Sequence, residues 1–476
     1  MEEEGHDMIS NLPSEIQKLI VSSIPLKEAV RTSILSTTWR SLWTPLQVNL
    51  DLGSTQITSH EATEKLKEIM GMFLRSNDSP RLLKLSIISP KNTTVSAEFV
   101  HEGFAMAIKG TDKDLQIDFA NAKQAICDFN LILNPSCPSH RHIHSMQTTS
   151  FSSLKTLHLT SITHLAENFV SSLFSSFWLL ESLKLEKCSG LRKIDIKGAN
   201  SLRNFVMKDC PNIISITLSA PNLKSFWYRG VLPNIELKNT PYLVDMVLDL
   251  KDGSGQNEFD CEDVLYFLSS LKDIEILTIS GWLLEWLCGA GVIFERLDFG
   301  LNKLKELCCL YSLMNRPLRD SLACFLNMTP NLEKLFVNID QSYIRIPCPF
   351  FHQYWHEPHL WMDYATVKCN AAQLKHLNII NLSGFTSEKD QLLLMDLLLH
   401  KALKPESMTV SSPENRSWSV AKIPQTHLNM TQRFQQKVAV ASPANMAYSF
   451  VLTEKREKKT ITYAQKMAGF CYSRLC

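Results

Sequence analysis

Residues 9–43 carry large apolar side chains at helical spacing, in three short segments. Pro13 and Pro25 begin the first two segments, where a helix tolerates the missing N–H, and Pro45 ends the third. Three helices in so few residues cannot bury this much apolar surface among themselves, because domains below about 40 residues rarely support a core. The pattern therefore predicts three short helices whose apolar face packs either on the rest of the chain, as a cap, or on another protein.

Downstream of these helices, apolar strand-like segments alternate with helix-compatible stretches. The strand-like cores lie at residues 48–52, 82–87, 115–119 and 154–159. Their spacing of roughly 32 to 38 residues suits the strand-plus-helix coils of a solenoid. Longer coils of the same kind return after Asp260 and continue to about residue 410.

Between these two regions the repeat is shorter. The pattern LxxLxL starts at residues 180, 191, 202, 213 and 223, and a step of about eleven residues leaves room for a strand and a turn but no helix. The larger repeat is two such units, since Cys188-Ser-Gly recurs as Cys210-Pro-Asn. We expect one strand of each coil on the concave face and one on the convex face, with Gly, Pro and Asn in the turns. The two cysteines should occupy equivalent interior positions without forming a disulfide.

The opening segment has the residue pattern Ile9-Ser10-x-Leu12-Pro13-x-Glu15-Ile16, then Ile24-Pro25-x-Lys27-x-Ala29-Val30-x-Thr32-Ser33-x-Leu35-Ser36, then Trp39-Arg40-x-Leu42-Trp43. This pattern closely resembles the F-box of plant F-box proteins with leucine-rich repeats. The segment from Gln373 to about residue 410, with a strand, a Gly-containing turn, an apolar helix and a final strand, resembles the FBD region of the same family. The resemblance covers residues 9 to about 410 and is most specific at the F-box.

The resemblance implies an α/β protein in which a small all-α F-box of three helices precedes a leucine-rich-repeat solenoid, or horseshoe. The corresponding domains are residues 1–47 for the F-box and 48–410 for the solenoid, with an FBD-like end at about 365–410. Residues 411–476 match no part of the family pattern. They are rich in Ser, Lys, Gln and Thr and contain the mixed-charge run EKREKK, a composition typical of a partly disordered, solvated tail.

In the family, the F-box helices dock on the Skp-type adaptor of a cullin–RING ubiquitin ligase. Carried over residue by residue, the resemblance implies an adaptor-binding face of Leu12, Pro13, Ile16, Ile20, Ile24, Leu26, Val30, Leu35, Trp39, Leu42 and Trp43. The family usually has Ser-Lys-Arg-Trp where this chain has Ser36-Thr37-Thr38-Trp39. Two positive charges of the family pattern are therefore absent, while the apolar positions remain.

The strands between residues 180 and 229 suggest a target-binding surface. In each LxxLxL copy the leucine-type positions point inward, so the alternating residues face outward. Aligning the copies places Ser182 with Asn204 and Ser225, and puts an outward tryptophan beside valine with basic neighbours, a composition typical of a binding hot spot. The candidate target-binding residues are Lys184, Val206, Lys208, Trp227 and Arg229. The alternative is that Trp227 packs under a neighbouring loop, since large aromatic side chains are usually mostly buried.

The composition disfavours nucleic-acid-binding, membrane-spanning and secreted proteins. The 476 residues include 49 Lys and Arg against 48 Asp and Glu, and this balance disfavours nucleic-acid partners, whose phosphates reward a strongly basic surface. No apolar run approaches the roughly 20 residues needed to cross a bilayer. The N-terminus MEEEGHDM lacks the features of a signal peptide, so we expect a cytoplasmic or nuclear location. The 13 cysteines form no CxxC pair and are expected to be buried, reduced thiols.

Two histidine clusters are the candidate metal sites. His352 and His356 would share a helix face, but the HExxH order is missing and Pro358 would break the helix, so an exposed aromatic loop is the preferred interpretation. His140, His142 and His144 alternate in a Ser- and Pro-rich loop and fit surface histidines better than a ligand set. No catalytic motif such as GxSxG is present. We therefore expect no catalytic residues, no metal and no cofactor.

Three hypotheses for the function follow. The first is a non-catalytic substrate-recognition subunit of an SCF-type (cullin–RING) E3 ubiquitin ligase, with the F-box docking the Skp-type adaptor and the repeats binding an unidentified target protein. The alternative is a leucine-rich-repeat scaffold outside any ligase, in which the F-box-like helices serve as a cap. An enzyme that uses the histidine cluster is the third and least supported.

Overall fold

The computed structural model describes residues 154–255, 259–350 and 373–424, with gaps of one to three residues, together with 47–51, 82–88, 111–118, 438–441, 448–454 and isolated positions between 9 and 39. The chain forms two compact units. The first unit comprises Met1–Leu223 with Lys238–Thr240, and the second comprises Lys224–Leu237 with Pro241–Cys476.

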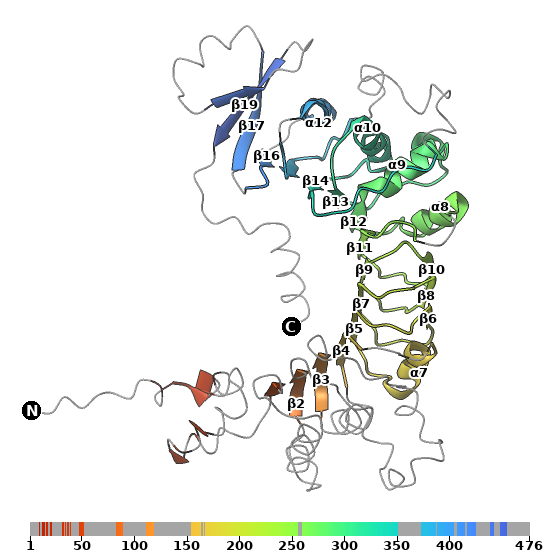
Figure 1. Ribbon diagram of the computed structural model, residues 1–476, viewed down its shortest axis with the longest axis vertical. Helices are drawn as coiled ribbons and strands as arrows, with labels where there is room; N and C mark the ends of the chain where they lie inside the picture. The colour runs from red at the N-terminus through yellow and green to blue at the C-terminus, as the bar shows by residue number, and fades with distance from the viewer. Residues whose placement is uncertain are drawn as a thin grey trace, which may run out of the picture. The chain divides into compact units, whose positions relative to one another are not determined.

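The first unit contains a parallel sheet in which the strands β1, β2, β3, β4, β5 and β7 follow one another. Their bounds are Gln47–Asp51, Leu82–Ile88, Thr111–Asp118, Thr156–Thr160, Ser182–Glu186 and Asn204–Lys208. A second parallel pair, β6 (Lys193–Ile196) and β8 (Ser215–Ser219), lies on the opposite side of the coils (Figure 1). The strands predicted from the sequence are confirmed, as is their alternation between two faces. Helix α7 (Phe169–Ser176) precedes the short repeats.

The turns that follow β5 and β7 repeat the same backbone conformation and the same cysteine hydrogen bond. Lys187 and Asp209, one coil apart, both adopt a positive φ, of 53° and 52°. The thiol of the following Cys188 donates to the carbonyl of Leu159 at 3.5 Å, and that of Cys210 donates to the carbonyl of Leu185 at 3.8 Å. Both cysteines are buried and free. The prediction of equivalent interior positions without a disulfide is therefore confirmed.

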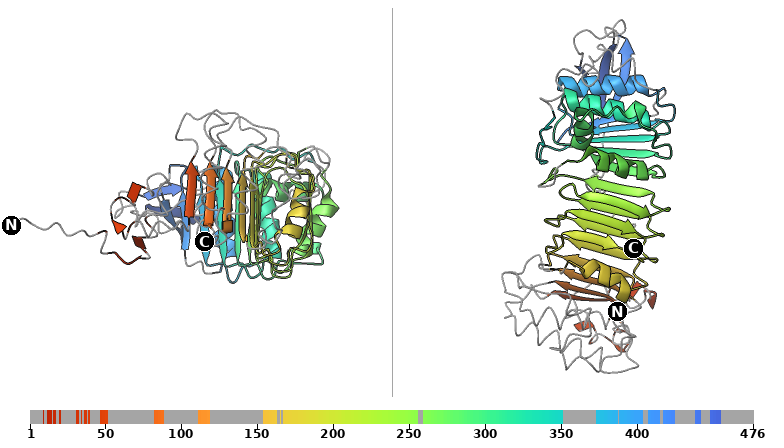
Figure 2. Two further views of the ribbon diagram at one scale, coloured as in Figure 1. Left: turned by 90° about the horizontal axis from the view of Figure 1, so that it is seen from below. Right: turned by 90° about the vertical axis from the view of Figure 1, so that its right-hand side faces the viewer.

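The second unit continues the parallel pattern with longer coils. Its parallel strands are β9 (Ser225–Arg229), β11 (Asp245–Asp249), β12 (Ile276–Ser280), β13 (Glu306–Tyr311), β14 (Lys334–Ile339), β15 (Ile379–Ser383) and β16 (Ser407–Ser411). Its helices are α8 (Cys261–Ser270), α9 (Gly281–Gly289), α10 (Arg316–Phe325) and α12 (Lys389–Lys401), with short 3-10 turns at Phe294–Arg296 and Leu326–Met328. Strand β10 spans Asn234–Asn239. Figure 1 and Figure 2 show α9, α10 and α12 side by side over this unit's sheet.

Local sequence explains where these helices begin. The Asp260 carboxylate caps α8 by accepting from the backbone N–H groups of Glu262 and Asp263 at 2.8 and 3.3 Å. The Asn315 side chain caps α10 by accepting from Leu318 N at 3.0 Å, and a proline occupies the first turn. The α/β fold class with leucine-rich-repeat coils predicted from the sequence is thus confirmed.

The sequence did not indicate two parts of this unit. All nine residues of α9 are buried, so its sequence GWLLEWLCG has no polar face from which a helical period could be recognised. The second part lies within residues 411–476, where β17 (Ser417–Pro424), β18 (Val438–Ala441) and β19 (Tyr448–Glu454) form antiparallel pairs next to β16.

The predicted order of strand, Gly-containing turn, helix and strand near the end of the repeats is confirmed by β15, Gly384, α12 and β16. Gly384 has a φ of +75°, and a Cβ atom placed there would collide with the backbone carbonyl of Ile339. Only glycine therefore fits this turn, because the neighbouring atom belongs to a backbone that cannot move aside.

Gly384→Ala is expected to destabilise the second unit by more than about 3 kcal/mol, since backbone strain and overpacking act together. Gly291→Ala is the matched control, because Gly291 has a φ of +94° but nothing within 4 Å of the added methyl group. Thermal unfolding of both variants measures the difference. Equal losses of stability would show that the collision with Ile339 is relieved without cost.

Candidate protein-interaction surfaces

The predicted adaptor-binding face is partly visible at the N-terminus. Leu12 is half-buried and Pro13 is exposed, and the carbonyl of Pro13 accepts from the backbone N–H groups of Ile16 and Gln17 at 2.9 and 3.1 Å, which forms a helical turn. Ile16 and Ile20 are 43% and 38% exposed. These predicted docking side chains are therefore accessible to a partner. Predicted positions outside the described residues are Ile24, Leu26, Val30, Leu35, Leu42 and Trp43.

Trp39, the remaining predicted docking residue, is buried, with 4% of its surface exposed. The hydroxyl of Ser36 accepts from the backbone N–H of Trp39 at 3.1 Å, as a capping side chain does at the start of a helix. Trp39 is therefore less accessible to a partner than Ile16 and Ile20.

In the first unit, the predicted target-binding residues lie on adjacent strands in register. Lys184 of β5 is opposite Val206 of β7, and Glu186 is opposite Lys208. The alternating positions Leu183, Leu185, Phe205 and Met207 are fully buried. Lys184, Glu186 and Lys208 are half-buried on the outward face, whereas Val206 is buried with 5% of its surface exposed. The outward face of this unit is therefore charged around a small apolar centre.

His158 extends this row onto β4, where it lies opposite Lys184. The Lys184 ammonium is 2.9 Å from the Glu186 carboxylate, and His158 Nε2 is 3.9 Å from the same carboxylate. Burial, reinforced by the charge of Lys184, lowers the pKa of His158 to about 4. Burial acts to raise the pKa of Glu186, but the hydrogen bond and charge of Lys184 outweigh it and hold the pKa below its usual value.

The low pKa of His158 predicts a pH-dependent stability. The unfolded chain protonates this histidine at its ordinary pKa of 6.5, whereas the folded chain does so only near 4, so the unfolded state binds more protons between these values. Stability is then fully present above pH 6.5 and falls by on the order of 3 kcal/mol as the pH approaches 4.

Chemical denaturation at a series of pH values measures this loss, and His158→Gln should remove it. The exposed His376 provides the control, because His376→Gln should leave the pH profile of the wild type unchanged. An unaltered profile in His158→Gln would contradict the assignment.

In the second unit, Trp227 and Arg229 lie two residues apart on the outward face of β9. Trp227 is opposite Val247 of β11, and Arg229 is opposite Asp249. The Arg229 Nε atom is 3.5 Å from Asp249 Oδ2, to which the hydroxyl of Tyr343 also donates at 3.2 Å. Asp249 is buried, with 6% of its surface exposed. Arg229 is therefore held by a buried carboxylate, while Trp227 is half-buried beside it.

Sequence reasoning missed His158, Asp249 and Tyr343, which fix the orientation of the predicted residues. The strand register places His158 beside Lys184, so an alignment extended to β4 would have found it. Tyr343 is 94 residues from Asp249 in the chain, and no local pattern links them.

Neither histidine cluster can be placed, since residues 140–144 and 352–359 lie outside the described residues. Within the described part of the chain, no group of three or more His, Cys, Asp or Glu side chains is arranged to hold a metal ion. None of the described helices combines the length and apolar character that a membrane span requires.

Comparisons with known proteins agree with this architecture. The family model of the At1g61320/AtMIF1 LRR domain matches residues 81–448, and the F-box domain model matches residues 9–50. The F-box/LRR-repeat protein At5g02910 of Arabidopsis thaliana is 27% identical over 348 residues, which cover 70% of this chain and 72% of that protein. The putative FBD-associated F-box protein At1g61330 of the same plant is 22% identical over 424 residues, which cover 86% and 92%.

Proposed function

This chain belongs to the F-box proteins whose repeats form an At1g61320/AtMIF1-type LRR domain, and we propose its function on that basis. It is a substrate-recognition subunit of an SCF-type cullin–RING E3 ubiquitin ligase, acting in the cytoplasm or nucleus. The observation that carries the proposal is the F-box match at residues 9–50 directly ahead of the LRR domain.

The proposed mechanism is proximity. The F-box binds a Skp-type adaptor and, through it, the cullin, while the outward faces of the repeat strands bind the target protein. Such a subunit carries out no chemistry itself. It raises the effective concentration of the target's lysines near the charged ubiquitin-conjugating enzyme, which turns an encounter between separate molecules into an event within one complex.

Exposed apolar side chains in the F-box support docking over the alternative role as a cap. Ile16 and Ile20, two residues of the predicted adaptor-binding face, are 43% and 38% exposed. A cap would bury its apolar residues on the solenoid, because that burial is what stabilises the packing. Exposed large apolar side chains on one helical segment are instead expected of a protein-binding site.

Affinity purification of two forms of the chain tests the proposal. The full-length chain should co-purify with a Skp-type adaptor and a cullin. The chain lacking residues 1–47 should lose both while retaining its target proteins, which should accumulate in the cell because they are bound but not ubiquitylated. Equal recovery of the adaptor with both forms would contradict the proposed role of the F-box.

Trp227→Ala is expected to weaken target binding by about 30-fold or more and to lengthen the half-life of the target, since truncated hot-spot residues typically cost 2 kcal/mol or more. Arg229→Ala is a poorer probe, because it would leave the buried Asp249 carboxylate without its ion pair. Trp178→Ala is the matched control, since Trp178 is 62% exposed on a different part of the chain. Normal target turnover in folded Trp227→Ala would place recognition elsewhere, on the coils after Asp260.

A further inference from the structure

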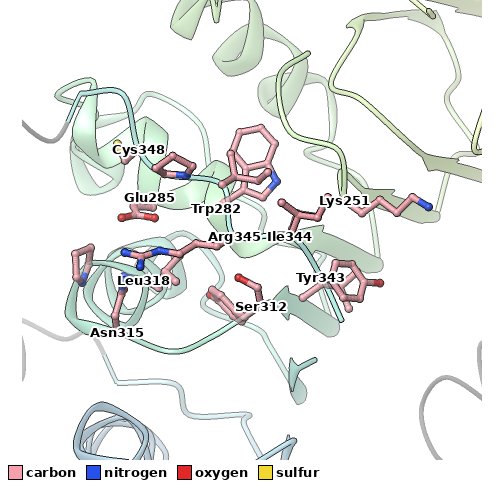
Figure 3. A pocket seen from close by; sticks show the side chains of 16 residues that line it. Lys251, Trp282, Glu285, Ser312, Asn315, Leu318, Tyr343, Ile344, Arg345 and Cys348 are labelled. Atoms are coloured by element: carbon pink, nitrogen blue, oxygen red, sulfur yellow. The ribbon is translucent and has the colours of Figure 1, made fainter. Parts of the chain in front are cut away.

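A cavity of about 380 Å³ lies in the second unit, where the parallel strands β12 and β13 end. The first turns of α9 and α10 and the segment that follows β14 complete its wall (Figure 3). Its volume falls at the small end of the roughly 300–1,000 Å³ typical of small-molecule sites. None of the target-binding residues predicted from the sequence lines it.

The cavity contains a buried carboxylate. Glu285, on α9, is 7% exposed, and no described residue lies within hydrogen-bond or ion-pair distance of its carboxylate. Burial raises its pKa to about 7 even though the positive charge of Arg345 acts to lower it. A charged carboxylate is costly to bury, so this group favours a ligand that supplies a positively charged donor.

The second charged group of the cavity is Arg345. Figure 3 shows the Glu285 carboxylate and the Arg345 guanidinium turned toward one another, whereas the Lys251 side chain extends away from them. Arg345 is exposed, so its guanidinium can donate hydrogen bonds to the carboxylate of a ligand. A ligand with only a negative charge would place a second anion beside Glu285, and one with only a positive charge would place a second cation beside Arg345. A ligand that carries both charges complements the pair.

Part of the remaining cavity wall is apolar. Trp282, Leu310 and Leu318 line it, and each is more than nine-tenths buried. The indole N–H of Trp282 donates to the carbonyl of Leu250 at 2.8 Å, which fixes the ring in place. A preformed aromatic wall beside two charged side chains is typical of sites that bind a small, partly apolar molecule.

We propose that this cavity binds a zwitterionic small molecule with an apolar body, of the kind represented by a free hydrophobic amino acid. Its ammonium group pairs with Glu285, its carboxylate pairs with Arg345, and its side chain packs against Trp282 and Leu318. The proposed site contains none of the residues predicted to bind the adaptor or the target.

The pairing predicts how affinity changes with pH. Glu285 must release its proton to pair with an ammonium group, so affinity should rise with pH up to about 7 and level off above it. Tyr311 and Cys288, two titratable groups beside Glu285, stay protonated in this range. Burial raises the pKa of Tyr311 well above its usual value, and the hydrogen bond with Cys324 together with burial does the same for Cys288.

Isothermal titration of the full-length chain with L-leucine, L-phenylalanine and L-tryptophan tests the proposal. At least one should bind saturably, while its N-acetyl and carboxamide derivatives, each lacking one charge, should bind at least about tenfold more weakly. The affinity of the free amino acid should increase between pH 6 and about 7. Absence of binding by all three, equal binding of the blocked derivatives, or an affinity that falls over this range would overturn the proposal.

Two variants test which side chain binds each charged group of the ligand. Glu285→Gln should fold normally, because it removes a charge that is costly to bury. It should abolish the pH dependence and weaken binding at least about tenfold. Arg345→Gln should remove the preference for the free carboxylate over the carboxamide. Glu262→Gln and Arg296→Gln, at exposed positions of the same unit, are the matched controls. Unchanged affinity and pH dependence in folded Glu285→Gln would overturn the assignment.

Discussion

Co-purification with a Skp-type adaptor is expected to be lost when Leu12 and Pro13 are both replaced by alanine. Truncating an apolar interface anchor typically costs about 2 kcal/mol or more, so two such changes lower the affinity by about a thousandfold. Pro13 is exposed and Leu12 half-buried, so the substitutions remove contact surface without emptying the core of the repeats. Pull-down of the variant from cells that express the adaptor measures the effect.

Ile34→Ala is the matched control for this experiment. Ile34 is an apolar F-box residue that is 81% exposed but lies outside the predicted adaptor-binding face. Its truncation should leave adaptor recovery close to that of the wild type. Normal adaptor binding by the Leu12→Ala, Pro13→Ala double variant would rule out the docking assignment. Unfolding of the whole chain by the same substitutions would favour the role of a cap.

Arg319→Ala is expected to destabilise the second unit by about 3–5 kcal/mol, because it leaves the buried Asp320 carboxylate without its buried partner. The Arg319 guanidinium is 2% exposed; it donates to Asp390 Oδ1 at 2.6 Å and to Asp320 Oδ1 at 2.8 Å. These contacts tie α10 to the first turn of α12. Burial raises the pKa of Asp320 even though Arg319 acts to lower it, so this carboxylate depends on the ion pair to stay charged.

Denaturant unfolding followed by the fluorescence of the buried tryptophans of α9 measures this loss. Arg316→Ala is the matched control on the same helix, since Arg316 is 51% exposed and pairs with Asp320 at 3.6 Å. An ion pair whose arginine is this exposed to solvent contributes about 1 kcal/mol or less. A loss of stability in Arg319→Ala no larger than in Arg316→Ala would show that the buried network does not hold the two helices together.

The repeat architecture could be predicted because its physical basis is periodic. Each LxxLxL copy buries two leucine-type side chains per strand, and the in-register pairs Leu183–Phe205 and Leu185–Met207 follow directly from aligning the copies. The turn cysteines could be placed for the same reason. Helix α9 could not, because a helix buried on every side has no amphipathic period, and it follows β12 without an intervening loop.

The groups that define the cavity were also beyond sequence reasoning. Glu285 and Arg345 lie on different elements, α9 and the segment after β14, and neither belongs to a recognisable motif. The same holds for Asp249 and Tyr343, which are 94 residues apart in the chain and are joined by a hydrogen bond. Asp249 in turn holds Arg229. Such pairs depend on how separate coils stack, whereas each repeat specifies only its own coil. The F-box could be recognised because its residues are contiguous.

Binding of the purified full-length chain to a purified Skp-type adaptor is the most direct test of the proposed function. Size-exclusion chromatography of the mixture should show a one-to-one complex, and titration should give a saturable affinity that is lost when residues 1–47 are removed. If the folded chain forms no complex with any Skp-type adaptor, while its circular dichroism shows intact helices and strands, the chain is not a ligase subunit and the F-box has another role.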